Sequence, residues 1–258
     1  MTWLAIATLC ALGLIVGGFI GCIGIGGVML VPALSYLGGI PIPTAIAAAM
    51  MGYLLTGAVG AAVYARRKSI RWSMALWLCA GAMPAALAGA WTSNNIPPVF
   101  LEVCIGLLTM SAGIHAIRGS RETQDSATQG DALSKPVLVL IGAVTGFGSA
   151  ITGTGGPLLL IPVLLWLQVP VLTAIGLSQA VQFPIASLAT VGNFMYGTPD
   201  LLIGAVLAVS LAAGAAIGAH LAHAIPREVL RRIVASVLIG VGVVILAKIA
   251  VAAAGVSP

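Results

Sequence analysis

Long apolar runs separated by short polar turns follow one another along the whole chain, and their lengths predict a bundle of membrane-spanning helices. A run of about 20 apolar residues forms a helix long enough to cross the hydrocarbon core of a bilayer, which is about 30 Å thick. We expect five helical elements in each half of the chain, at residues 3–23, 28–39, 44–65, 72–92 and 98–117, then at 136–152, 157–168, 172–196, 201–223 and 228–253. The second element of each half reaches only about 18 Å, so it cannot cross the bilayer alone.

Composition supports an all-α integral membrane protein. Of the 258 residues, 60% are hydrophobic and 7% are charged, whereas soluble domains carry about 25% charged residues. Backbone groups in lipid must form hydrogen bonds internally, and the runs lack the alternating pattern of a membrane barrel strand. The first run has no basic segment before it and no small-residue cleavage site, so we expect a mature helix rather than a signal peptide.

The two halves of the sequence resemble each other at one constant offset of 129 residues. The aligned pairs include Gly24 with Gly153, Gly26 with Gly155, Gly27 with Gly156, and Ile96-Pro97 with Ile225-Pro226. Such a match along the whole chain indicates an internal duplication. We therefore divide the chain into a first membrane repeat at 1–117, a hydrophilic cytoplasmic linker at 118–135 and a second membrane repeat at 136–258.

The basic residues predict that the two repeats are inverted in the membrane. The turn after the third element contains four of them in the first half and none in the second, whereas the turn after the fourth element shows the reverse pattern. With inverted repeats and a cytoplasmic linker, every Lys and Arg except Lys248 lies inside. With parallel repeats the three arginines at 227–232 lie outside, which the positive-inside rule disfavours. Inversion requires an odd number of crossings per half, so the first two elements must act as two crossings or as a hairpin that returns.

Two glycine-rich segments, GIGG at 24–27 and GTGGP at 153–157, interrupt the helices inside the predicted membrane region. Breaking a helix there frees amide donors that lipid cannot satisfy, so each break must face protein or water. We therefore expect a cavity. The short elements begin directly after the breaks and direct their N-termini, each with about half a positive charge, into this cavity. Such an arrangement binds anions.

We predict that the two breaks and the polar residues near them bind the substrate, mainly through the second half. The polar residues of the second half stand opposite mostly apolar ones at the same offset, since Ser178 and Gln179 align with Ala49 and Met50. The candidate substrate-binding residues are Gly24, Ile25, Gly26, Gly27, Thr152, Gly153, Thr154, Gly155, Gly156, Ser178, Gln179, Gln182 and Asn193. The alternative is structural, because small residues and side-chain amides also hold membrane helices together.

Other chemistry is poorly supported by the sequence. We find no His, Cys, Asp and Glu cluster for a metal or an enzyme, and no nucleotide-binding motif, so we expect no cofactor and no catalysis. The net charge of +5 reflects loop residues that set membrane topology, so we do not expect nucleic acid as a partner. Glu102 is the one acidic candidate for proton coupling.

The quoted motifs resemble those of the TauE/SafE sulfite exporter family. The resemblance rests on GGFIGCI at 17–23 before the first break, on GFGSAITGTGGPLLLIP at 146–162, and on the TAI-initiated helices after each break. It implies a bacterial cytoplasmic (inner) membrane transporter of small sulfur-containing anions such as sulfite, sulfoacetate or other organosulfonates. Relatives are often drawn with about eight spans. The first break has Val28 where the second has Pro157, so the two helix ends need not be equivalent.

We therefore expect a secondary transporter that binds its anion at the membrane midplane and works by alternating access. A passive anion channel or uniporter is the alternative from another class, and small carboxylates are alternative substrates. The sequence leaves open which anion is carried, in which direction, whether a proton or sodium ion is coupled to it, and whether the protein is a homodimer.

Overall fold

The computed structural model describes residues 3–36, 38–92, 133–196 and 199–253, and scattered positions between 103 and 117. All regular structure in these residues is α-helical. The helices are α1 (Trp3–Ile23), α2 (Gly27–Tyr36), α3 (Ile42–Arg66), α4 (Trp72–Thr92), α6 (Lys135–Thr152), α7 (Pro157–Trp166), α8 (Val171–Tyr196), α9 (Leu201–Ala224) and α10 (Arg227–Ala253). The element predicted at 98–117 and the linker lie largely outside the described residues.

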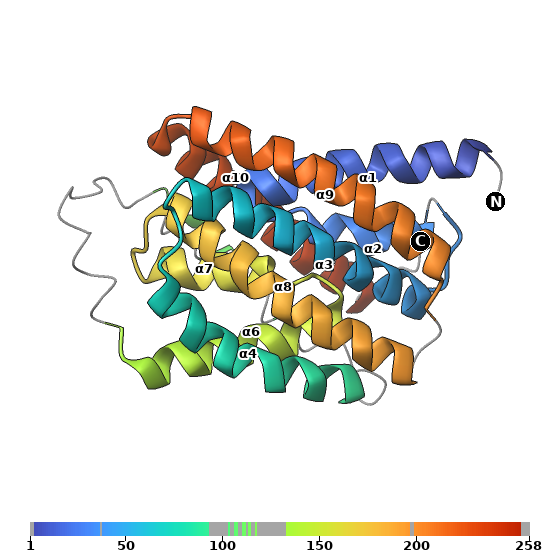
Figure 1. The fold of residues 1–258 in the computed structure, drawn as a ribbon, viewed down its shortest axis with the longest axis horizontal. Helices are drawn as coiled ribbons and strands as arrows, with labels where there is room; N and C mark the ends of the chain where they lie inside the picture. Colours follow the sequence, from blue (N-terminus) through green and yellow to red (C-terminus); the bar gives the residue numbers. More distant parts are fainter. Residues whose placement is uncertain are drawn as a thin grey trace.

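The long helices lie roughly along one common direction (Figure 1). Seven described helices are long and apolar enough to cross a membrane, which confirms the all-helical, multi-pass prediction. Helices α2 and α7 have ten residues each, or about 15 Å, and are the two predicted short elements. Apolar side chains that face outward, such as Leu140 at 64% and Val209 at 67% exposure, are consistent with lipid around the bundle.

The offset seen in the sequence recurs in the helix boundaries. Helices α3 and α8 begin 129 residues apart, as do α4 and α9, and α1 and α6 end 129 residues apart. The packing recurs as well, because α1 packs most extensively against α9 and α4 against α6. Each of these pairs joins the first element of one half to the fourth element of the other half.

Glycines allow close approach of the helices at both of these contacts. A Cβ on Gly17 of α1 would overlap the carbonyl of Leu211 in α9, and a Cβ on Gly146 of α6 would overlap the carbonyl of Ala82 in α4. Gly17 and Gly146 are themselves separated by the 129-residue offset. These glycines are therefore packing residues, as small residues at membrane helix contacts usually are.

The long helices α1 and α6, α3 and α8, and α4 and α9, which occupy corresponding positions in the two halves, point in opposite directions. In Figure 1, α1, α3 and α9 run from right to left, whereas α4, α6 and α8 run from left to right. Neighbouring residues agree with this view, since Gly57 of α3 lies against Phe183 of α8, and Gly60 of α3 lies against Gln179 of α8. Residue numbers therefore rise along α3 in the direction in which they fall along α8, so the two helices are antiparallel.

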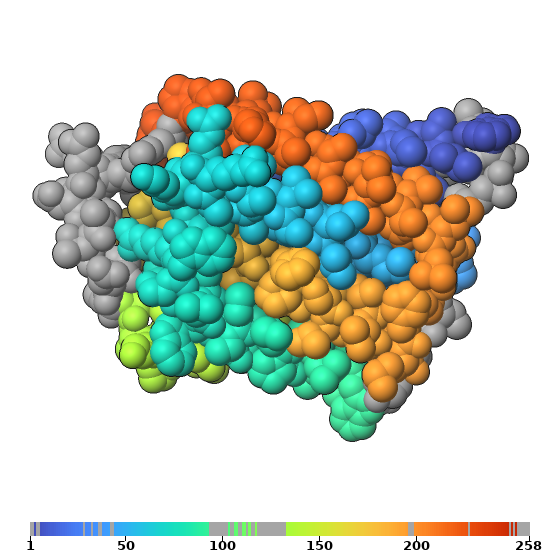
Figure 2. All heavy atoms as spheres, in the orientation of Figure 1, coloured from blue at the N-terminus to red at the C-terminus, as the bar shows by residue number. Residues whose placement is uncertain are grey.

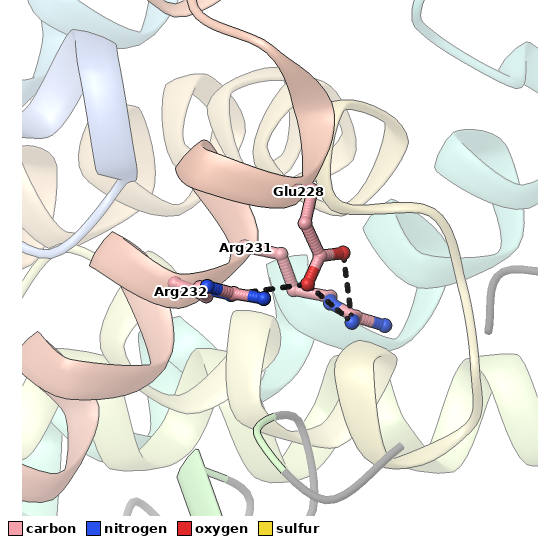
Figure 3. Close-up of polar contacts among 3 residues, drawn as sticks. All are labelled: Glu228, Arg231 and Arg232. Atoms are coloured by element: carbon pink, nitrogen blue, oxygen red, sulfur yellow. Dashed lines mark hydrogen bonds and ion pairs between the residues drawn. The ribbon is translucent and has the colours of Figure 1, made fainter. Parts of the chain in front are cut away.

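Basic residues gather at one end of the bundle, where the α3–α4 loop meets the end of α9 and the start of α10. Ser69 Oγ in this loop lies 3.0 Å from Nε2 of His223 at the end of α9. At the start of α10, Glu228 accepts hydrogen bonds from Arg231 Nη2 and Arg232 Nε at 3.0 and 3.1 Å (Figure 3). Membrane topology explains such a one-sided distribution of charge.

On the face shown in Figure 2, the side chains of α3, α4, α8 and α9 form a continuous surface. The two glycine breaks lie in the interior, since residues 24–27 and 153–156 are all buried. The fold therefore places both breaks inside a shell of long helices.

Candidate functional site

Each break begins with a glycine whose left-handed backbone ends the preceding helix. Gly24 has φ +77° and Gly153 has φ +70°. Their amides donate back to the helix they end, from Gly24 N to Ile20 O at 2.9 Å and from Gly153 N to Ser149 O at 3.0 Å. A residue with a side chain is disfavoured at this capping position, so both glycines have a local structural role.

The second break bends more sharply than the first. Gly155 and Gly156 also have positive φ angles, +81° and +99°. Pro157 is the first residue of α7, a position at which an N–H group would form no hydrogen bond within the helix, so proline is tolerated there. In the first break only Gly24 has a positive φ. The two helix ends are therefore not equivalent in backbone conformation.

The two breaks lie against each other and share one tyrosine. A Cβ on Gly27 would overlap the carbonyl of Thr154. The hydroxyl of Tyr53 in α3 donates a hydrogen bond to Gly27 O at 3.0 Å, and a Cβ on Gly155 would lie 2.7 Å from Cδ2 of the Tyr53 ring. Tyr53 is completely buried and contacts both breaks.

The sequence analysis missed Tyr53 as a candidate site residue. Its position in the first repeat is the one that Gln182 occupies in the second, and a polar group at that position in both halves was the available signal.

Several buried backbone amides of the breaks have no hydrogen-bond partner within the described part of the chain. They belong to Ile25, Gly26 and Gly27 in the first break and to Thr154, Gly155 and Gly156 in the second. A buried polar group without a partner costs about 1–3 kcal/mol. These amides precede or begin α2 and α7, where the helix dipole adds positive potential, so they favour an anionic occupant.

The described residues do not show the cavity that we predicted at the breaks. Residues 23–27 and 153–162 are all buried, and the side chain of Ile161 in α7 packs directly on Gly24. An anion reaches the amides only if the helices around the breaks separate.

The three predicted hydroxyl ligands already donate their protons elsewhere. Thr152 Oγ1 donates to Gly148 O at 2.7 Å, so in the 2.9 Å pair of the two threonines it is Thr154 that donates to Thr152 Oγ1. Ser178 Oγ donates to Ile175 O at 2.7 Å. These residues lie beside the breaks as predicted, but in this conformation they offer lone pairs rather than protons.

The two predicted glutamines differ sharply in their contacts. Gln179 Nε2 donates to Ile20 O of α1 at 2.7 Å, so its amide connects α8 to α1. Its Oε1 lies beside Gly60 of α3 and, like that of Gln182, has no hydrogen-bond partner within the described chain. Gln182 is 1% exposed, no hydrogen bond of its side chain is seen within the described chain, and its Oε1 is buried without a partner. Gln182 is thus the better candidate for contact with a ligand.

Asn193 is not placed near the breaks. It is partly exposed near the end of α8, about 16 Å along the helix from Gln182. Its prediction as a substrate contact rested on polarity inside an apolar segment, which does not specify depth along a helix.

Charged and metal-binding groups are absent from the described surroundings of the breaks. Every described Lys, Arg, Asp and Glu lies in a loop, at a helix end or in the first two turns of α10, except Lys248, which lies in the last two turns of α10. The described residues contain no group of three or more His, Cys, Asp and Glu that could hold a metal ion. Glu102, the candidate for proton coupling, lies outside the described residues.

Comparison with known proteins identifies a protein family that the chain matches. The model of the family named "Sulfite exporter TauE/SafE" matches residues 9–245. No solved structure matches the chain significantly.

Curated relatives are similar to the chain over nearly their whole length. The chain is 27% identical over 231 residues to the probable membrane transporter protein YdhB of Bacillus subtilis (strain 168), covering 88% of this chain and 93% of YdhB. It is 25% identical over 240 residues to the probable membrane transporter protein YjnA of the same organism, with 88% and 94% covered. It is 24% identical over 252 residues to the probable membrane transporter protein MJ0441 of Methanocaldococcus jannaschii, with 91% and 93% covered. The chain therefore belongs to the TauE/SafE sulfite exporter family and is a probable multi-pass membrane transporter rather than an enzyme.

Proposed function

We propose that the protein is a secondary transporter that moves small sulfur-containing anions, such as sulfite, sulfoacetate or other organosulfonates, across the bacterial cytoplasmic membrane. The anion is held near the midplane by the backbone amides at the starts of α2 and α7. The single observation that carries this proposal is the set of six buried break amides without partners in the described chain. An oxyanion with several acceptor oxygens satisfies donors of this kind.

Burial of both breaks is consistent with alternating access. The breaks are buried and touch each other through Gly27 and Thr154, so binding and release both need a movement of the surrounding helices. Transporters built from inverted repeats make that movement by rocking one bundle against another around a midplane site.

We further propose that the two halves are inverted repeats related by a pseudo-two-fold axis in the membrane plane. The opposed directions of α3 and α8 and the crossed pairs α1–α9 and α4–α6 support this relation. Helix α2 returns toward the end at which α3 begins, so α1 and α2 act as the returning hairpin that an odd crossing count requires.

Cysteine labelling tests the inversion. In a variant without native cysteines, we expect Ser69→Cys to react with a membrane-impermeant maleimide only from the cytoplasmic side and Pro199→Cys only from the outside, because Ser69 and Pro199 lie in equivalent turns of the two halves. Reaction of both residues from the same side would establish parallel repeats.

A transport assay tests the function. Purified protein in liposomes is expected to accumulate radiolabelled sulfite or sulfoacetate when a proton or sodium gradient is imposed, and liposomes without protein are not. If no sulfur anion is taken up but a matched carboxylate such as malonate is, the protein is a carboxylate transporter instead. Uptake that only equilibrates the anion, with no response to either gradient, would favour the passive uniporter.

The uniporter is kept as the second candidate on one observation. The described part of the site contains no carboxylate that could bind a coupling proton or sodium ion.

A further inference from the structure

Ser149, which was not among the predicted site residues, has an unusual buried hydroxyl. It lies in α6, one turn before the second break, and its side chain is completely buried. Within the described chain its Oγ has no hydrogen-bond partner, although serines in helices usually bond back to a preceding carbonyl. The hydroxyl proton of Ser149 is therefore available.

This hydroxyl faces the start of α7. Ser149 Oγ lies 3.9 Å from the position of a Cβ on Gly156, and the amide of Gly156 is one of the free amides of the second break. The backbone of the same residue is fixed, because Ser149 O accepts the capping bond from Gly153 N at 3.0 Å. The free hydroxyl of Ser149 thus lies close to the free amides at the start of α7, beside the side chain of Ile185, whose Cδ1 is 3.2 Å from the same Cβ position.

The first break has no such group. The residue equivalent to Ser149 in the first repeat is Ile20, whose side chain packs on Gly26 with Cγ1 2.7 Å from the position of a Cβ there. Ile25 of the first break is also apolar and buried. The polar donors are therefore concentrated at the second break.

The electrostatic surroundings of the second break limit the charge of the anion that it can bind. The described side chains place no full positive charge near the break, and only helix dipoles and neutral donors remain. The cost of removing an ion from water rises with the square of its charge in a continuum description. A singly charged oxyanion is therefore favoured over a doubly charged one of the same shape.

We propose that Ser149 is a substrate-binding residue that donates its hydroxyl to a singly charged tetrahedral oxyanion held on the free amides before α7. This inference rests on the proposed anion-transport function and narrows it to one half of the molecule and to a singly charged oxyanion group, such as a sulfonate, at the break. It places the ligand at the second break rather than equally between the two.

Binding of methanesulfonate and sulfate to the purified full-length protein tests the proposal, because the two ions are both tetrahedral and differ in charge. Calorimetry on wild-type protein is expected to give an affinity for methanesulfonate at least about tenfold higher than for sulfate. Ser149→Ala is expected to lower methanesulfonate affinity by about tenfold or more, the usual effect of losing a hydrogen bond to a charged group.

The matched control is Ser210→Ala. Ser210 is also buried, but its hydroxyl donates to Val206 O of its own helix at 2.8 Å, so its loss should leave both affinities unchanged. Should Ser149→Ala not fold, Ser149→Cys retains the volume with a weaker donor and is expected to change affinity in the same direction.

The outcomes separate this inference from the proposed function. Wild-type protein that binds methanesulfonate, together with a folded Ser149 variant of unchanged affinity, overturns the role of Ser149 alone. Equal or tighter binding of sulfate overturns the preference for a single charge. Wild-type protein that binds neither ion, nor sulfite, overturns the anion function and this inference with it.

Discussion

Replacing Gly155 by leucine is expected to reduce the affinity for a sulfonate by more than about a hundredfold while the protein still inserts into the membrane. Gly155 has φ +81°, and a side chain in this left-handed conformation costs about 1–2 kcal/mol. Its first carbon would also lie 2.7 Å from the Tyr53 ring. The ring must then move, and with it the hydroxyl that is bonded to Gly27 O.

Methanesulfonate calorimetry on detergent-purified protein measures the effect. The matched control is Gly240→Leu, because Gly240 in α10 is exposed and has no neighbouring atom within 4 Å of its Cβ position. Gly155→Ala is the milder variant and is expected to change affinity in the same direction. A folded Gly155→Leu protein with wild-type affinity would show that the second break does not contact the substrate.

Replacing Gln182 by leucine is expected to make the empty protein more stable and the substrate affinity much lower. Its buried Oε1 has no hydrogen-bond partner in the described chain, so an apolar side chain of similar size removes a cost of about 1–3 kcal/mol. The same change removes the donor and acceptor that we assign to ligand contact. Opposite changes in melting temperature and affinity distinguish a binding residue from a packing residue.

Gln179→Leu is the matched comparison and is expected to make the empty protein less stable. It removes the 2.7 Å bond to Ile20 O, which then loses one of its partners at the break, so the melting temperature should fall. Melting curves of the two variants without ligand make the comparison. A lower melting temperature for Gln182→Leu than for wild type would contradict the view that its amide is unpaired.

The free energy cost of the unsatisfied groups at the breaks connects the stability of the empty protein to its function. Free amides, left-handed glycines and an unpaired Gln182 all lower the stability of the empty state. A ligand that forms hydrogen bonds with these groups is held only in the conformation in which the two breaks lie together. When the surrounding helices separate, the ligand is released. The arrangement suits a binding site that must also empty.

The helices and breaks were predictable because their signals are local. Apolar run length defined the long helices, and glycine clusters at one constant offset located both breaks within a few residues of where α2 and α7 begin. The offset also predicted that corresponding helices start at equivalent positions. These features depend on neighbours in sequence and on duplication, both of which are visible in a single chain.

The contacts inside the site were not predictable in the same way. The hydroxyl of Thr152 bonds to the carbonyl one turn back, and this use of its proton depends on a side-chain rotamer. The contact of Gly27 with Thr154 joins two halves of the chain, and no sequence period encodes it. Ser149 was overlooked because a lone serine in an apolar helix is usually bonded within that helix.

The most direct test of amide-based anion binding observes the break amides themselves. The sequence contains only four Gly-Gly peptide bonds, ending at Gly18, Gly27, Gly39 and Gly156. Protein made with glycine labelled at both the carbonyl carbon and the nitrogen therefore gives carbonyl-coupled amide signals from these four residues alone. Two belong to the breaks, and two are internal controls in α1 and in the α2–α3 loop.

Titration with methanesulfonate is expected to move the Gly27 and Gly156 amide signals with the same midpoint as calorimetric binding, and to leave Gly18 and Gly39 in place. The Gly156 signal should move further, since the donors are concentrated at the second break. Saturating, calorimetrically confirmed binding with all four signals unmoved would contradict the account.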